Sequence, residues 1–307
     1  MYVLCSPCIL SPSLRAKGIT HPYDLALFAR SIGRCKKFGI EVVPLPCPET
    51  LYLGPDHEPG TYLERLNTPE FATLLEDLCG KVNGIIEERG PPLCILGVNS
   101  SPTCGVTSTY YGAENGRPPK RSGRGVFYAK FPGIPARDVA EFSKYRIYLA
   151  APLFSEAERS YNAVIADLLR AHYFEVFLPQ DSGDNHAVRG REEHQRIFNH
   201  NRRAIHDADI VVAIIDGADA DSGTAWEMGY AAAHKKRVIA LRTDFRMTGS
   251  HERVNLMLEQ AGQMVTTRDE LLSVLGALGN TGKKEAGSSD NPYGKNRETP
   301  EGDARQN

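Results

Sequence analysis

The sequence predicts an α/β protein with two domains, the second of them a flavodoxin-like, doubly wound parallel sheet. Apolar runs of strand length alternate with helical segments along residues 1–131 and again along residues 145–278. Such alternation is typical of parallel sheets covered by helices. All seven cysteines fall within the first 104 residues, which indicates that the two domains differ in character.

Composition limits the classes of partner. The chain has 307 residues, 41% of them hydrophobic and 24% charged, which is typical of a globular protein of about two domains. A net charge of -2 gives no electrostatic reason to expect nucleic acid or an anionic membrane as a partner. The first ten residues, MYVLCSPCIL, lack a basic segment and contain a proline, so we expect a core strand rather than a signal peptide and a cytoplasmic protein.

The first domain is expected to hold three strands, at residues 2–5, 40–45 and 92–98, with helices at 21–39 and 68–90. Thr68 followed by Pro69 is a typical helix start. Residues 99–125 are rich in Gly and Ser and predict a loop. Residues 132–144 contain two prolines and no strong periodicity, which indicates an interdomain linker.

The second domain, residues 145–278, is expected to hold four strands, at 145–154, 174–179, 210–215 and 237–242. Helices are predicted between and after them. One begins with a capping box at Ser155, and the others cover 191–208, 222–236, 251–260 and 268–278. Residues 279–307 are polar and nearly free of apolar side chains, and they predict a disordered tail.

Three cysteines each follow a predicted strand of the first domain: Cys8, Cys47 and Cys104. The carboxyl ends of parallel strands meet at one edge of a sheet, so we expect these thiols to converge. Three thiolates with one open position suit an iron–sulfur cluster that keeps a site for substrate. The alternative is three unrelated loop cysteines, while the other four are expected to be small buried side chains.

The segment from Asp209 to Tyr230 is where the chemistry of the second domain is expected. A buried strand ends in an acidic loop, and a helix begins near Ser222, which is the usual place for a ligand in such sheets. Glu227 should lean back over Gly223 and leave an open carboxylate at the pocket mouth. The candidate substrate-binding residues around it are Asp216, Ser222 and Gly223, and Tyr148 ends an earlier strand.

Three alternatives stay open for this segment. Asp221 or Ser222 could simply cap the helix, and Glu227 could lie on a solvated face. The aspartates Asp216, Asp219 and Asp221 could together hold Mg²⁺ through hard oxygen ligands. Trp226 is the only tryptophan, and its position beside Glu227 favours packing in the core over stacking on a base.

The motifs of the first domain resemble the thiouracil desulfurase family over about residues 1–131. They are SPC ending at Cys8, the segment PCPE, and SPTCG followed by GRGVF. The resemblance implies that Cys8, Cys47 and Cys104 hold a four-iron four-sulfur cluster whose fourth iron is free for substrate sulfur. It also implies active-site roles for Glu49 and Ser101. After the first motif this chain runs CILSPSLRAKG, where the family normally has another cysteine.

The motifs of the second domain are similar to those of the nucleoside 2-deoxyribosyltransferase family, from about Tyr145 to Arg242. They are IYLAAPLFSEAERSYN, VFLPQD, IFNHN, DADIVVAIIDG and DSGTAWEMGYAAA. The resemblance implies the following roles: nucleophile for Glu227, sugar-hydroxyl binding for Asp221, orientation of the nucleophile for Tyr148, and base contact or pocket closure for Gln180 and Asp181. Where the family often has an aspartate, this chain has Asn201, whose amide can bond a base edge but cannot act as a general acid.

These observations predict an enzyme that cleaves or transfers the N-glycosidic bond of a (deoxy)nucleoside or nucleotide through a covalent glycosyl intermediate. The second domain needs no cofactor for this chemistry, and the first would act on sulfur-containing bases. The resemblance also implies a homo-oligomer, because family members often complete their pockets with a neighbouring subunit. The alternatives are a hydrolase without transferase activity and a non-catalytic nucleotide-sensing protein.

Overall fold

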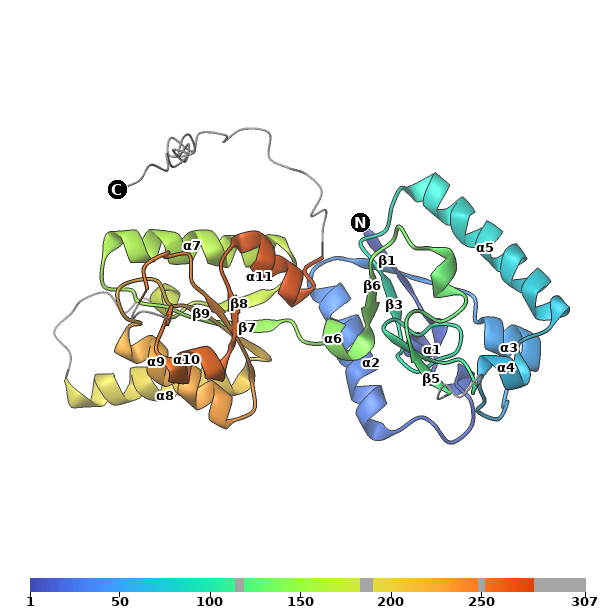
Figure 1. Ribbon diagram of the computed structural model, residues 1–307, viewed down its shortest axis with the longest axis horizontal. Coiled ribbons are helices and arrows are strands. Elements are labelled where there is room, and N and C mark those ends of the chain that lie inside the picture. Colours follow the sequence, from blue (N-terminus) through green and yellow to red (C-terminus); the bar gives the residue numbers. More distant parts are fainter. Residues whose placement is uncertain (114–118, 183–189, 248–251, 279–307) are drawn as a thin grey trace, which may run out of the picture.

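The computed structural model describes residues 1–113, 119–182, 190–247 and 252–278. The predicted disordered tail, 279–307, therefore lies outside the described residues. Two parallel sheets lie side by side, one built from the first part of the chain and one from the second (Figure 1). The predicted α/β class is confirmed.

The first sheet has the strand order β2-β1-β3-β6, and all its pairings are parallel. The strands are β1 (Tyr2–Cys5), β2 (Glu41–Pro44), β3 (Ile95–Gly97) and β6 (Ala136–Asp138). Helix α5 (Pro69–Arg89) packs on one face, while α2 (Pro22–Lys37) and α6 (Val139–Phe142) pack on the other. The shorter helices are α1 (Pro7–Leu10), η1 (Pro12–Leu14), α3 (Pro48–Leu53), α4 (Tyr62–Arg65) and η2 (Tyr128–Lys130).

Two expectations for the first half are corrected. The linker prediction for residues 132–144 is wrong for its central part, because β6 joins the edge of the first sheet and α6 buries Val139 and Phe142 against it. Elements of three and four residues are too short to show a period, which is why the sequence did not reveal them. The loop 99–125 carries an antiparallel hairpin, β4 (Ser108–Tyr110) with β5 (Lys120–Ser122).

The second sheet has the order β11-β10-β9-β7-β8, all parallel. When the five strands are numbered within this half alone, their order is the predicted flavodoxin-like order. The strands are β7 (Arg146–Ala150), β8 (Glu175–Phe177), β9 (Ile210–Ile214), β10 (Arg237–Leu241) and β11 (Gln263–Val265). The last of these was not predicted, because an edge strand of three residues leaves no clear pattern. Between and after the strands come α7 (Glu156–Ala171), η3 (Pro179–Ser182), α8 (Arg191–Asp207), α9 (Ser222–Ala233), α10 (Leu256–Ala261) and α11 (Arg268–Leu275).

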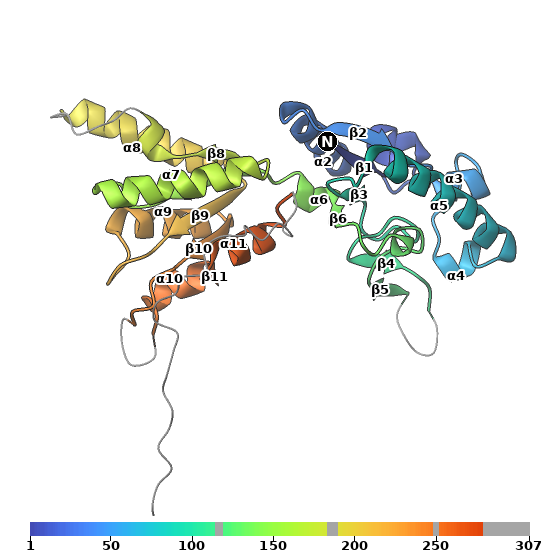
Figure 2. The ribbon, with the colours of Figure 1, turned by 90° about the horizontal axis from the view of Figure 1, so that it is seen from above.

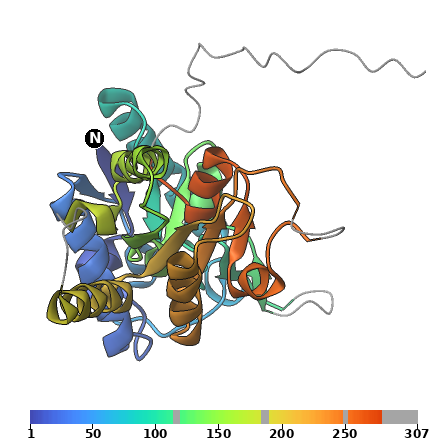
Figure 3. The ribbon, with the colours of Figure 1, turned by 90° about the vertical axis from the view of Figure 1, so that its left-hand side faces the viewer.

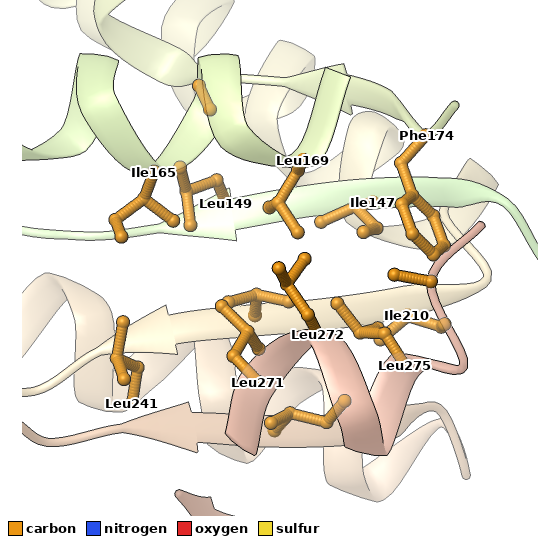
Figure 4. Packing of buried hydrophobic residues seen from close by; sticks show 14 of the residues in the cluster. Ile147, Leu149, Ile165, Leu169, Phe174, Ile210, Leu241, Leu271, Leu272 and Leu275 are labelled. Carbon is orange, nitrogen blue, oxygen red and sulfur yellow. The ribbon is translucent and has the colours of Figure 1, made fainter. Parts of the chain in front are cut away.

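Alternate residues of the central strands face opposite layers. Ile147 and Leu149 of β7 join the core under α7 and α11 (Figure 4), whereas Tyr148 and Ala150 face the layer that includes α8 and α9. Figure 3 views the molecule from the side of this half and shows helices on both faces of the sheet. This alternation carries Tyr148 to the same side of the sheet as Glu227.

The two halves meet along α2 (Figures 1 and 2). Arg34 of α2 is buried, and its guanidinium donates to the carbonyl oxygens of Phe142 (2.9 Å) and Tyr173 (3.0 Å from Nη2). Arg30 donates to both carboxylate oxygens of Asp209 at 2.7 and 2.6 Å. The bonds from Arg34 to Tyr173 and from Arg30 to Asp209 join α2 to the second half of the chain. Within the described residues, no helix combines the length and apolar character needed to cross a bilayer.

Candidate active sites

Helix α9 positions the predicted nucleophile. It begins at Ser222, as expected, and Asp221 is its N-cap: the Oδ2 atom accepts from the backbone N of Thr224 at 2.9 Å and from its Oγ1 at 3.2 Å. The capping alternative for Asp221 is therefore realised through one carboxylate oxygen. Glu227 follows in the second turn and is partly buried.

Tyr148 lies on β7 beside the central strand β9 and is fully buried. Its ring stacks on Phe177 of β8, with centroids 5.4 Å apart and planes 13° apart. Its hydroxyl donates a hydrogen bond to Oε1 of Glu227. Because the ring is buried and stacked on Phe177, its hydroxyl fixes the orientation of the carboxylate. The structure thus brings together the two residues for which the sequence suggested nucleophile and orienting roles.

The carboxyl group of Glu227 does not titrate like an exposed glutamate. Burial raises its pKa from 4.5 to about 7, the bond from Tyr148 acts in the opposite direction, and the negative charge of Asp221 raises the pKa further. The nearby helix N-terminus favours the ionised form of this group. Desolvation is the larger effect, so a substantial fraction of Glu227 is protonated at neutral pH.

A cavity of about 320 Å³ opens beside Glu227, lined by Phe198 and Asn201 of α8 and by Gly223, Trp226 and Glu227 of α9. It contains the glycine and the amide that the sequence singled out. The preference for core packing of Trp226 is wrong, because its side chain lines the cavity and is 46% exposed. Sequence reasoning also missed Phe198, which only the pairing of α8 with α9 brings to this place.

Other predicted substrate residues lie apart from this cavity lining. Asp216 accepts from the backbone N of Thr243 and Asp244 and from Oγ1 of Thr243, and so ties the loop after β9 to the loop after β10. Ser222 is exposed at the start of α9. Gln180 bonds to the carbonyl of Arg159 and to the amide of Asn162, and Asp181 pairs with Arg170. These contacts hold the fold together.

The three predicted thiols converge in the first half. Cys8, Cys47 and Cys104 line one cavity of about 490 Å³, which confirms that the loops after β1, β2 and β3 meet at one edge of the sheet. Burial raises the pKa of all three thiols, that of Cys8 to about 12. Nowhere in the described ranges do three or more His, Cys, Asp or Glu side chains form a group suited to a single metal ion, the aspartates of the second half included.

Glu49 lies in the same cavity and is held by hydroxyl groups. Its Oε1 accepts from Oγ of Ser101 at 2.9 Å and from Oγ1 of Thr103 at 2.7 Å. On the other side, Nε2 of His57 lies 3.8 Å from Oε2, and this carboxylate raises the pKa of His57. The sequence suggested Glu49 and Ser101. Thr103 lies inside the SPTCG motif and could have been included, but nothing in the pattern pointed to His57.

Close backbone packing shapes the loop that carries Cys104. A Cβ atom on Gly125 would lie 2.4 Å from the carbonyl carbon of Thr103, and one on Gly97 would lie 2.4 Å from the carbonyl oxygen of Cys104. Only glycine allows these approaches. At the base of the same loop, Asp138 of β6 accepts from the backbone N of Asn99 at 2.7 Å. The segment taken for a linker therefore supports the thiol cavity.

Comparison with known families gives one match in each half of the chain. Residues 147–268 match the family model "Nucleoside 2-deoxyribosyltransferase", and residues 1–131 match the model "Putative 2-thiouracil desulfurase". Both resemblances stated from the sequence are confirmed, each in the half for which it was predicted. No curated protein matches the chain.

Several solved structures are similar to part of the chain. A conserved protein from Enterococcus faecalis V583 is 27% identical, over 43% of this chain and 97% of its own, with a TM-score of 0.37. A 2-deoxyribosyltransferase from Bacillus psychrosaccharolyticus is 25% identical, over 42% and 95%, with a TM-score of 0.37. A 2-desoxiribosyltransferase from Leishmania mexicana is 26% identical, over 42% and 95%, with a TM-score of 0.35.

Proposed function

We propose that the second half of the chain cleaves or transfers the N-glycosidic bond of a nucleoside or nucleotide, with Glu227 as the nucleophile. The observation that carries the proposal is the pairing of a cavity-lining Glu227 with the buried hydroxyl of Tyr148. The family match over residues 147–268 supports the substrate class.

The chemistry uses the ionised form of Glu227, whose fraction grows as the pH rises through about 7. As the N-glycosidic bond breaks, its electron pair leaves with the base and positive charge develops at C1′. The Glu227 carboxylate stabilises that charge and then bonds to C1′ as a glycosyl ester. An incoming base or water attacks C1′, gives up a proton and releases the carboxylate. The departing base takes a proton from solvent, because the amide of Asn201 cannot act as a general acid.

Three residues around Glu227 support this step. Tyr148 holds one oxygen of Glu227, so the carboxylate need not reorganise on binding. Gly223 leaves space over the carboxylate at the start of α9. Asp221 caps the helix through Oδ2, and its negative charge raises the pKa of Glu227, which supports the proposal that Asp221 binds a sugar hydroxyl.

The test is a panel of ribo- and deoxynucleosides and their 5′-monophosphates, each with and without an acceptor base, followed by product analysis. Wild-type protein should release free base or form an exchanged nucleoside. Glu227→Ala should lower that rate at least about a thousandfold, since the covalent route is lost. A variant that works at the wild-type rate would show that Glu227 is not the nucleophile. Exchange without hydrolysis would identify a transferase, and base release alone a hydrolase.

For the first half we propose an iron–sulfur cluster held by Cys8, Cys47 and Cys104, serving a site for sulfur-containing bases. The donor set fits, because all three cysteines line one cavity and Glu49 lines it with them. When bound, the cluster would supply an iron that accepts sulfur. The protein's part is to hold the base, with Glu49 fixed by Ser101 and Thr103. Anaerobically purified protein should be brown and contain iron, and Cys104→Ser should lose both properties. Colourless, iron-free wild-type protein would refute the proposal.

A further inference from the structure

Two aromatic side chains form one wall of the Glu227 cavity. Phe198 of α8 and Trp226 of α9 are 47% and 46% exposed, and their ring centroids lie 5.4 Å apart with planes tilted by 55°. Tyr230 lies parallel to the indole of Trp226, with centroids 5.1 Å and planes 13° apart. The guanidinium of Arg202 lies 5.6 Å from the centroid of Phe198. Both rings are thus supported on their own helices.

Exposed apolar surface of this kind is unfavourable in water, and covering such a ring with a ligand is favourable. A large exposed apolar side chain therefore suggests an occupant that covers it when it lies beside a functional group. The wall shares its cavity with Glu227 and with the amide of Asn201. Among the described residues that line this cavity, none is cationic. Its chemistry is that of a site for a flat, neutral group with polar atoms on its edge.

We infer that Phe198 and Trp226 are the base-binding residues of the site. The inference rests on the proposed function and specifies the part of the substrate that each residue contacts. A planar heteroaromatic base packs against the outer surface of the wall, because the two rings touch one another and leave no gap between them. The Asn201 amide faces the base edge, where it can both donate and accept, and the sugar carbon faces Glu227.

The sole tryptophan of the chain makes this directly measurable, because all indole fluorescence comes from Trp226. We would titrate Glu227→Gln protein, which cannot turn over, with adenine, cytosine and 2-thiouracil, and with 2-deoxyribose as the non-aromatic control. At least one base should change the emission in a saturable way, and the sugar alone should not. Phe198→Ala in the same background should weaken base binding by about fivefold or more. Phe245→Ala is the matched control, because this phenylalanine is 94% exposed and lies outside the cavity.

A second measurement separates binding from a loss of folding. In otherwise wild-type protein, Trp226→Ala should raise KM more than it lowers kcat, and Trp226→Phe, which keeps an aromatic ring, should raise KM by less than Trp226→Ala does. Unchanged emission with a base that the wild type releases or exchanges would overturn the inference and leave glycosyl transfer intact. Emission that changes with protein concentration alone would overturn it in favour of self-association through this wall. If the wild type turns over no nucleoside, the proposed function fails, and the titration still decides whether bases bind at Trp226.

Discussion

Replacing Glu227 by glutamine should make the protein inactive and, above neutral pH, more stable. The wild-type carboxyl has a pKa of about 7 in the folded protein against an ordinary 4.5, chiefly because it is buried. Between these two values the folded state keeps a proton that the unfolded state has lost. Stability contributed by this group is therefore present below pH 4.5 and is lost as pH rises through about 7. Glutamine is neutral throughout and can still accept the bond from Tyr148.

The pKa values set the size of the effect. A rise from 4.5 to about 7 corresponds to roughly 3 kcal/mol, and partial exposure of the side chain reduces this to about 1–2 kcal/mol. In a domain of this size each kcal/mol changes Tm by about 2–4 °C. The Tm of Glu227→Gln should therefore exceed that of wild type by several degrees at pH 8 and by little at pH 4.5. Thermal unfolding followed by circular dichroism at several pH values measures the difference.

The matched control is Glu259→Gln, which changes an exposed carboxyl on α10 and should leave the Tm difference from wild type nearly independent of pH. A Glu227→Gln variant that shows the same Tm difference at pH 4.5 and pH 8 would refute the reasoning. So would one that is less stable than wild type at pH 8. Either result would mean that the carboxylate is well solvated or is paired with a cation in the folded protein.

The remaining predictions concern residues that contact Glu227 or support its surroundings. Tyr148→Phe removes the hydrogen bond that lowers the pKa of Glu227, so the acidic limb of the kcat/KM profile should move to higher pH. Asp221→Asn keeps an oxygen for the helix cap but removes a charge that raises that pKa, so the same limb should move to lower pH, whatever happens to the maximal rate. Asp216→Ala deletes three hydrogen bonds between loops and should destabilise the protein by about 2–4 kcal/mol in denaturant unfolding, while the limb stays in place. A limb that moved in Asp216→Ala would instead place Asp216 in the site.

The sequence was sufficient for the long elements of the fold. The run Ile210–Ile215, the capping box at Ser155 and the Thr68–Pro69 start all correspond to observed features, because each has a strong local signal. The sequence failed for β6 and β11, strands of three residues that exist because a neighbouring strand offers hydrogen-bonding partners. Such edge strands are specified by the sheet more than by their own residues.

In the candidate sites too, some features could be predicted from the sequence and others could not. Convergence of Cys8, Cys47 and Cys104 followed from the rule that parallel strands end at one edge. The wall of Phe198 and Trp226 did not follow, because it depends on how α8 packs beside α9. The pKa of Glu227 could not be predicted either, since a helix N-terminus and burial act in opposite directions and only the fold decides which is larger.

The boundary between the two halves is set by the fold and does not coincide with the end of the sequence motifs. The family match of the first half ends at residue 131, yet its sheet is completed by β6 and covered by α6, both later in the chain. Leu278, at the end of the second half, is buried in the core of the first. Arg34 can be buried because its guanidinium donates to carbonyl oxygens contributed by α6 and by the turn before β8. Cutting the chain at residue 131 would remove a strand from the first sheet and leave a buried cation short of acceptors. The two candidate sites are therefore parts of one interdependent fold, and their activities are best measured on the intact chain.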